Sequence, residues 1–325
     1  MKYNRFFRML SILLVISLLM QMGPLSILAA SPASKTNEAE VSTEQAPATI
    51  VREEESLRNV YEKHFLLSDG SNLAVAYGVP VHYQNEDGVW QDIDNSLTQQ
   101  TLKNGVSVYT TANAVVPTAF SSSLATGNLF TSSNGSDSVS MTLLDTSTAN
   151  KLIAQYGSIN ASEGISRVDS ANLTFNRNAV ATIFTDTDNI QTVDTNSAVS
   201  STKQTGWTTE DILPQNLSSS IIYEDVFPDV DFRYTTHGYS VKEEIIVNTA
   251  KETYIYHFLL ALNGYTPQMN DDGSISLLNE KQEAIYYIPA PYMTDDAGEH
   301  SDKVTYTLTE VDNGVLLTVI YGAGI

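Results

Sequence analysis

The stretch Val304–Tyr321, VTYTLTEVDNGVLLTVIY, indicates the architecture of the chain. In its first half, Val304, Tyr306 and Leu308 alternate with threonines, which places apolar side chains on one face of a strand and polar ones on the other. Asn313-Gly314 then supplies the positive φ angles that a tight hairpin turn requires, and an apolar run follows. The stretch therefore predicts two antiparallel strands with one face on a core.

The same two signals recur along the chain. Apolar residues occupy every second position of residues 73–83 and of Tyr254–Leu262. Asp-Gly or Asn-Gly pairs separate such runs, at residues 69–70, 87–88, 104–105, 134–135, 263–264, 272–273 and 313–314. No run of ten or more residues after position 70 has a convincing helical period. We therefore predict an all-β fold of antiparallel, β-sandwich-like lobes joined by hairpins.

The middle of the chain, about residues 121–220, is crowded with Ser, Thr, Asn and Asp and has few apolar residues. Short strands are expected there at Val139–Leu144, Leu173–Phe175 and Ile183–Phe184. We expect an N-terminal β-rich lobe (56–145), an irregular Ser/Thr/Asn-rich bridging region (146–214) and a C-terminal β-rich lobe (215–325). The alternative is one large sandwich, of which the middle forms an exposed part.

The N-terminus has the features of a secretory signal peptide. Lys2, Arg5 and Arg8 precede the apolar run Met9–Met20, and small residues follow at the expected cleavage site near Ala30. The run is shorter than the ~20 apolar residues of a membrane-spanning helix. We therefore predict a signal peptide at residues 1–30, no stable membrane insertion after its cleavage, and a secreted, extracellular protein.

Residues 31–55 are rich in Ser, Thr, Ala, Glu and Pro and contain no aromatic residue. Such a composition buries too little apolar surface to order itself, so we predict a disordered linker. The whole chain has 17 Lys and Arg against 38 Asp and Glu, a net charge of -21, which argues against nucleic acid as a partner. It has no cysteine, which excludes disulfides, thiol catalysis and cysteine metal sites.

The sequence contains no recognisable catalytic motif. Its five histidines, none in an H-E-x-x-H pattern, are His64, His82, His237, His257 and His300. The G-x-S-x-G motif of hydrolases and the glycine-rich loops that bind nucleotides are also absent. Glycoside hydrolysis needs two carboxyl groups ~5–9.5 Å apart in a cleft. Glu243-Glu244 and Asp295-Asp296 are adjacent pairs, whose members point to opposite faces of a strand. We predict no enzyme, no catalytic residue and no cofactor, and keep a carboxylate-dependent glycoside hydrolase as the least favoured alternative.

The most distinctive stretch is Tyr223–Tyr234, YEDVFPDVDFRY. Asp225, Asp229 and Asp231 could approach a Ca²⁺ ion, which takes 6–8 oxygen ligands. The plainer interpretation is a proline-containing turn that leads into a strand, with Arg233 as a counter-charge on the same face as Asp231. No EF-hand spacing supports calcium, so we favour the turn and predict no metal site.

Aromatic residues suggest an alternative function. The chain has 17 tyrosines, and a row of exposed Tyr or Trp on one sheet face would bind sugar rings, as in a wall-polysaccharide-binding β-sandwich. Most of these tyrosines lie in strand-like runs, where aromatic residues are favoured for packing. Trp90 follows the Asp87-Gly88 turn and is expected to pack on its hairpin. We therefore favour core packing over sugar binding.

Six motifs occur in order along the chain. They are Lys63–Gly70 (KHFLLSDG), Val79–Tyr83 (VPVHY), Gly88–Asn95 (GVWQDIDN), Val226–Asp231 (VFPDVD), Lys242–Ile246 (KEEII) and Ile288–Met293 (IPAPYM). Together they resemble the N-terminal region of large secreted Gram-positive proteins that carry a DNRLRE domain, among them wall-associated proteins with RHS (YD) repeats and polymorphic toxins. The resemblance covers roughly residues 52–320.

The resemblance implies an exported, surface-associated protein whose N-terminal region is non-catalytic. Such regions usually continue into a Trp-containing segment before the DNRLRE unit, whereas this sequence ends at Gly322–Ile325. The resemblance therefore implies a truncated form, and puts a toxin or delivery role in doubt. We expect a scaffold module with cell-wall polymers or downstream surface-protein segments as partners.

Overall fold

The computed structural model describes residues 14–18, 47–157, 172–184, 212–214, 216–249, 253–312 and 314–322. These residues form mostly antiparallel β-sheets, which confirms the predicted all-β class. Their helical elements are η1 (Glu55–Leu57), a 3-10 turn, and α1 (Thr146–Tyr156). Neither helix is long and apolar enough to cross a membrane.

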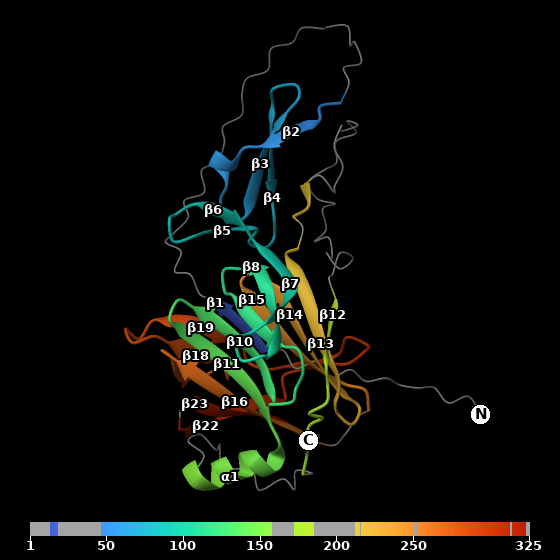
Figure 1. Ribbon diagram of the computed structural model, residues 1–325, viewed down its shortest axis with the longest axis vertical. Coiled ribbons are helices and arrows are strands. Elements are labelled where there is room, and N and C mark those ends of the chain that lie inside the picture. Colours follow the sequence, from blue (N-terminus) through green and yellow to red (C-terminus); the bar gives the residue numbers. More distant parts are fainter. Residues whose placement is uncertain are drawn as a thin grey trace, which may run out of the picture. The chain divides into compact units, whose positions relative to one another are not determined.

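Two eight-stranded sheets dominate the structure (Figure 1). The first has the order β12 (Ala181–Phe184), β13 (Ser218–Phe227), β14 (Val230–His237), β15 (Ser240–Val247), β1 (Leu14–Leu18), β19 (Ala284–Ile288), β18 (Ile275–Leu278) and β17 (Thr266–Met269). The second has the order β22 (Val304–Val311), β23 (Gly314–Gly322), β16 (Thr253–Asn263), β11 (Asp137–Leu144), β10 (Asn128–Asn134), β9 (Thr118–Ser121), β8 (Ser107–Asn113) and β7 (Asp94–Thr101). A short hairpin of β20 (Met293–Thr294) and β21 (His300–Ser301) accompanies them.

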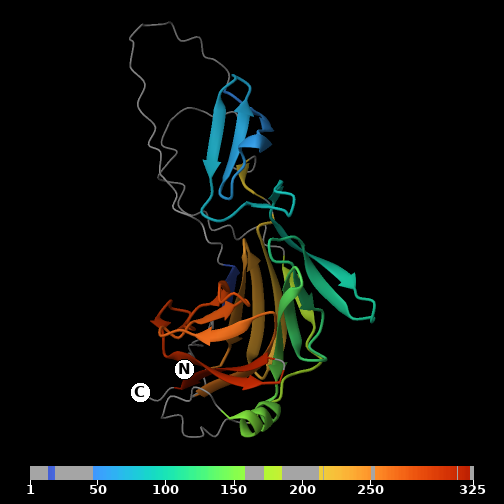
Figure 2. The same cartoon turned by 90° about the vertical axis from the view of Figure 1, so that its left-hand side faces the viewer.

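The two sheets share one hydrophobic core, so they form a sandwich (Figure 2). Alternating residues of both sheets point into it, as period-2 patterning requires. Phe232 on β14 packs on Phe258 on β16, with ring centroids 6.0 Å apart. The Tyr223 hydroxyl donates a hydrogen bond of 2.6 Å to the carbonyl of Ser121 in the opposite sheet. Burial of these aromatic side chains removes a large apolar area from water and stabilises the sandwich.

Strands that are far apart in the sequence take part in this sandwich. β11 pairs with β16, with Val139 opposite Leu262, and β7 to β10 continue the same sheet. The described residues within 1–19, 93–189 and 215–325 accordingly form one compact unit. Strands from residues 94–144 and from residues 218–322 thus lie in the same two large sheets.

The described residues within 20–92 and 190–214 form a second, smaller unit. Its strands are β2 (Ile50–Glu53), β3 (Glu62–Leu67) and β4 (Asn72–Ala76), which make a three-stranded sheet. A separate hairpin consists of β5 (His82–Gln84) and β6 (Trp90–Asp92). β2 lies within residues 31–55, so the end of the stretch expected to be a disordered linker is ordered, because β2 pairs with β3.

The turn prediction is confirmed in large part. Six of the seven Asp-Gly or Asn-Gly pairs join paired strands of one hairpin. The exception, Asn263-Gly264, leads from β16 in one sheet to β17 in the other. Gly264 has a φ of +84°, and a Cβ atom there would lie 2.6 Å from the Asp137 carboxyl group. This position therefore needs glycine for its backbone angle and for space.

Two local predictions in the middle of the chain are wrong. Helix α1 occupies 11 residues where no helical run was expected. It ends at Tyr156, and the following Gly157 has a φ of +77°, which glycine adopts without a steric penalty. Leu173–Phe175 is not a strand, although the Phe175 side chain is buried and its backbone N–H donates to the Asp145 carboxylate at 3.0 Å. The strands predicted at 139–144 and 183–184 lie within β11 and β12.

Candidate functional site

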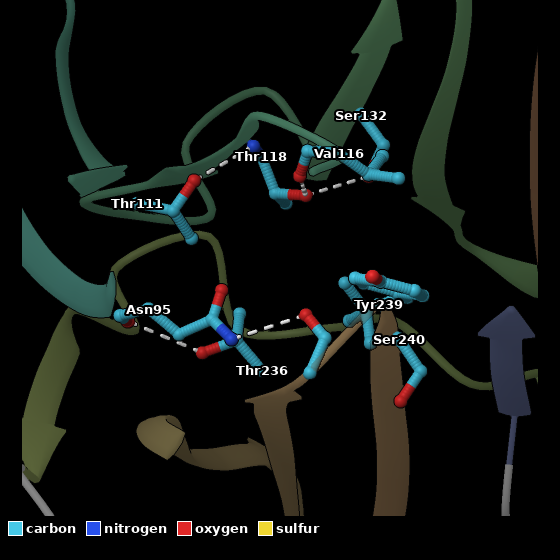
Figure 3. A pocket seen from close by; sticks show the side chains of 10 residues that line it. Asn95, Thr111, Val116, Thr118, Ser132, Thr236, Tyr239 and Ser240 are labelled. Carbon is cyan, nitrogen blue, oxygen red and sulfur yellow. Dashed lines mark hydrogen bonds between the residues drawn. The ribbon is translucent and has the colours of Figure 1, made fainter. Parts of the chain in front are cut away.

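A small pocket in the sandwich is lined mainly by hydroxyl and amide groups (Figure 3). Its lining residues are Asn95, Thr111, Val116, Thr118, Ser132, Thr236, Gly238, Tyr239, Ser240 and Val241. Figure 3 shows Thr111, Thr118 and Ser132 on one side and Asn95 and Thr236 on the other. Sequence patterns do not reveal this pocket, because its residues come from β7 to β10 and from the β14–β15 hairpin.

Most polar groups of the pocket bind other protein atoms. The Asn95 side-chain amide donates to the carbonyls of Leu217 and Gly238, at 3.0 and 3.2 Å. The Thr118 and Ser132 hydroxyls lie 2.9 Å apart, within hydrogen-bond distance. The lining residues carry no charged side chain, and the space between them is about that of one water molecule.

A cluster of charges occupies the smaller unit. The Arg58 guanidinium contacts Glu53 at 2.6 Å and Asp92 at 3.0 Å, and the Lys63 ammonium contacts Asp92 at 2.5 Å. The fully buried His82 lies beside the same carboxylates, with its Nε2 atom 3.4 Å from Asp92. A hydrogen bond from His82, helped by the two cations, holds the pKa of Asp92 well below its usual range. The groups neutralise one another, so the cluster is a structural network.

Glu243 is a buried carboxyl group inside the sandwich. Its Oε1 atom accepts a hydrogen bond from the Tyr234 hydroxyl, and its Oε2 atom has no hydrogen-bond partner. Burial raises the pKa of Glu243 to about 8, while the bond from Tyr234 opposes that shift. A raised carboxyl pKa is a mark of general acids. Here, however, the neighbouring titratable groups are Tyr234 and Tyr306 rather than a second carboxylate.

The adjacent carboxylate pair behaves as expected for a strand. Glu243 points into the core, whereas Glu244 is partly exposed and accepts a hydrogen bond of 2.8 Å from Lys242. Of the histidines, His257 is buried on β16 beside the Thr318 hydroxyl at 2.9 Å. Burial lowers the pKa of His257 to about 4, which keeps the ring neutral. The burial of Glu243 and of His257 is thus explained by their packing in the core.

The aspartates of the Tyr223–Tyr234 stretch lie in or beside a turn, which two of them stabilise by a hydrogen bond. Pro228 and Asp229 form the turn between β13 and β14, as the plainer interpretation predicted. The Asp231 carboxylate accepts bonds from the Asp225 backbone N–H at 2.8 Å and from the Asn248 amide at 3.1 Å. Among the described residues, no group of three His, Asp or Glu side chains is placed to hold a metal ion.

The counter-charge of this stretch differs from the prediction. Arg233 lies 3.7 Å from Glu244, its neighbour across the β14–β15 pair, instead of Asp231. Glu244 also forms an ion pair of 2.8 Å with Lys242, so the Glu244 carboxylate lies beside two cations on the face of the sheet that points away from the core.

Exposed aromatic residues are few in the described part of the chain. The aromatic residues among its exposed large apolar side chains are Tyr61 and Phe184, which belong to different units. Tyr256, Tyr286 and Tyr306 are buried, as core packing predicts. The described residues therefore present no row of Tyr or Trp on one sheet face.

These features define a class: an antiparallel β-sandwich with a small neutral pocket, accompanied by a smaller unit with a charge network. Part of the chain is similar to wall-associated proteins of bacilli. It is 33% identical over 107 residues to the tRNA nuclease WapA of Bacillus subtilis (strain 168). It is 31% identical over 87 residues to the Wall-associated protein of Geobacillus stearothermophilus.

The extent of these matches limits what they establish. The first covers 31% of this chain and 4% of the Bacillus subtilis protein, and the second covers 26% of this chain and 34% of the Geobacillus protein. No known protein-family profile matches the chain. No solved structure matches it either. The similarity is therefore distant and partial.

Proposed function

We propose that this chain is a non-enzymatic, secreted or cell-wall-associated scaffold module, the N-terminal part of a DNRLRE/RHS-type surface protein. The partial similarity to wall-associated proteins is the observation that carries the proposal. The predicted signal peptide and the absence of cysteine fit an exported protein of a single-membrane bacterium.

The buried side chains support a structural role. The aromatic residues and Glu243 are used in the core, and the charges of the smaller unit neutralise one another. The tRNA nuclease activity in the name of the Bacillus subtilis relative belongs to a protein of which this chain covers a small part. We do not extend it to this chain, because a net charge of -21 opposes RNA binding.

The proposal is tested by fractionating cultures of the native host into medium, wall and membrane and measuring intact mass. We expect a species near the mass of residues 31–325 in the medium or the wall. A much larger species that contains these peptides would support a truncated sequence of a longer surface protein. Retention in the membrane with residues 1–30 attached contradicts the proposed cleavage.

A second assay addresses the non-enzymatic part. The purified protein is incubated with isolated cell-wall material and with tRNA, and soluble sugar and RNA fragments are measured. We expect no release above that of a boiled sample. Release that depends on a folded protein would overturn the proposal and favour a hydrolase.

A further inference from the structure

The first sheet of the sandwich consists of two parts that are joined through one short strand. β12 to β15 form one part and β17 to β19 form the other. β15 pairs with β14 on its outer edge, and β19 pairs with β18. Their inner edges face each other, and β1 (Leu14–Leu18) lies between them. The sheet is continuous because a segment of the predicted signal peptide completes it.

The spacing of this gap fits one strand. β1 is antiparallel to both neighbours, with Ser17 opposite Ser240 on β15 and opposite Tyr287 on β19. Neighbouring strands lie about 4.8 Å apart, so β15 and β19 are about 10 Å apart, too far for direct hydrogen bonds. The backbone N–H and C=O groups of both inner edges therefore need a strand between them.

On their core-facing side, the strands that border the gap carry buried, uncharged side chains, whereas Lys242 and Glu244 of β15 lie on the opposite face and pair with each other. Val241 and Ile245 on β15 and Tyr286 and Ile288 on β19 are buried, and burial keeps the Glu243 carboxyl neutral up to a pH near its pKa of about 8. A charged side chain placed among them would lose its hydration without a partner. The site therefore selects an extended segment with apolar, uncharged side chains at its core-facing positions, such as the one opposite Val241, and β-branched residues fit a central strand.

We propose that the gap between β15 and β19 is a strand-acceptor site. It binds an extended segment of about five residues with apolar, uncharged side chains at the core-facing positions, antiparallel to both edges. In the full chain the segment LVISL of residues 14–18 occupies it, and after removal of the signal peptide the site takes a strand of the same chemistry from another polypeptide. The inference stands on the pairing of the sheet and, for the vacant site, on the proposed cleavage of the signal peptide; it does not depend on wall association or on the scaffold role.

The test uses the absence of cysteine in the full chain. The Ser17→Cys/Ser240→Cys and Ser17→Cys/Tyr287→Cys variants place thiols on directly opposite residues of both edges. The matched control, Ser17→Cys/Ser276→Cys, places them two strands apart, because Ser276 pairs with Tyr287. That separation exceeds the ~7 Å limit between the Cα atoms of a disulfide. Each variant is refolded from urea and oxidised, and cross-linked protein is quantified by mass spectrometry.

The probe for an external strand is a synthetic LVISL peptide with lysine tails, present in large molar excess during refolding. We expect cross-linking in the first two variants, little in the control, and a several-fold loss of cross-linking with the peptide. A peptide with lysine at the position of Ile16 should have no effect. Equal cross-linking in all three variants, or cross-linking that the peptide does not reduce, would overturn the proposal.

Discussion

The sandwich and the smaller unit are stabilised in different ways. The sandwich core contains aromatic side chains from both sheets, among them Phe120, Phe130 and Tyr234, whose ring centroids lie 5.6–6.0 Å apart. In residues 47–92 the buried apolar side chains are Phe65 and Val81. That part carries the network of Arg58 and its neighbours instead. A small unit buries a smaller share of its apolar surface, so polar networks take a larger part in fixing its structure.

The largest expected effect is on the sandwich core. Phe232 is fully buried and its ring contacts Phe227, Tyr256 and Phe258. Phe232→Ala should lower the free energy of unfolding by about 3–5 kcal/mol, because it removes apolar contacts and leaves a cavity. Urea unfolding followed by circular dichroism measures the change. The control Phe184→Ala, at an exposed position, should change it by about 0.5 kcal/mol or less. Similar losses in both variants would contradict a core that is stabilised by buried rings.

The next effect is a pH dependence of the stability of the sandwich, which contains the buried Glu243. The pKa of Glu243 is raised to about 8 in the fold, above its ordinary value near 4.5. The folded state therefore favours the protonated carboxyl, and this part of the stability is full below about pH 4.5 and is lost as pH rises towards 8. Glu243→Gln should gain stability over the wild type between pH 5 and pH 8, by an amount on the order of a few kcal/mol. The measurement is the free energy of unfolding in urea as a function of pH. The same pH dependence in the wild type and in Glu243→Gln would contradict a neutral Glu243.

A smaller effect is expected in the charge network. Arg58→Gln leaves Glu53 and Asp92 with fewer cations and should destabilise the smaller unit by about 1–2 kcal/mol, since the pair is only partly buried. Hydrogen exchange of the β3 and β6 amides measures the loss. Salt at 1 M should lower the protection of these amides from exchange more than that of the β14 amides, because it screens the charges of the network. Arg177→Gln, which removes a more exposed ion pair with Asp145, is the matched control and should have little effect. Equal protection of β3 in wild type and Arg58→Gln would remove the distinction between the regions.

The smallest effect comes from the hairpin turns. Gly88 and Gly105 have φ of +75° and +84° and open space around the position of a Cβ atom, so an added methyl group meets only the backbone penalty. Alanine should cost about 1 kcal/mol at either position. We expect Gly88→Ala to increase the rate of cleavage in the β5–β6 hairpin during limited proteolysis. Gly105→Ala should leave the large sheet as resistant to cleavage as in the wild type. The reverse order of sensitivity would show that the smaller unit is the more stable one.

Local patterns made part of this fold predictable. The alternation around Val304–Tyr321 and the Asn-Gly turns predicted the hairpins, because both signals act between neighbours in sequence. Pairing between distant strands, such as β11 with β16, is set by long-range packing, which one sequence does not reveal. Helix α1 was missed because its two buried residues, Thr146 and Ala149, give no clear apolar stripe. The pocket and the charge network also join distant residues, such as Asn95 with Gly238 and Lys63 with Asp92.

The position of β16 has a consequence for the way the chain folds during synthesis and export. β16 pairs with β11 on one edge and with β23 on the other, so it joins β22 and β23 to the other five strands of the second sheet. A chain that emerges N-terminus first presents β7 to β11 with a long unpaired edge until residues 253–263 follow. Such an edge invites pairing with other chains, and contacts so distant in sequence form slowly. The time between the emergence of β11 and that of β16 is therefore the interval in which a holding chaperone would protect this protein best.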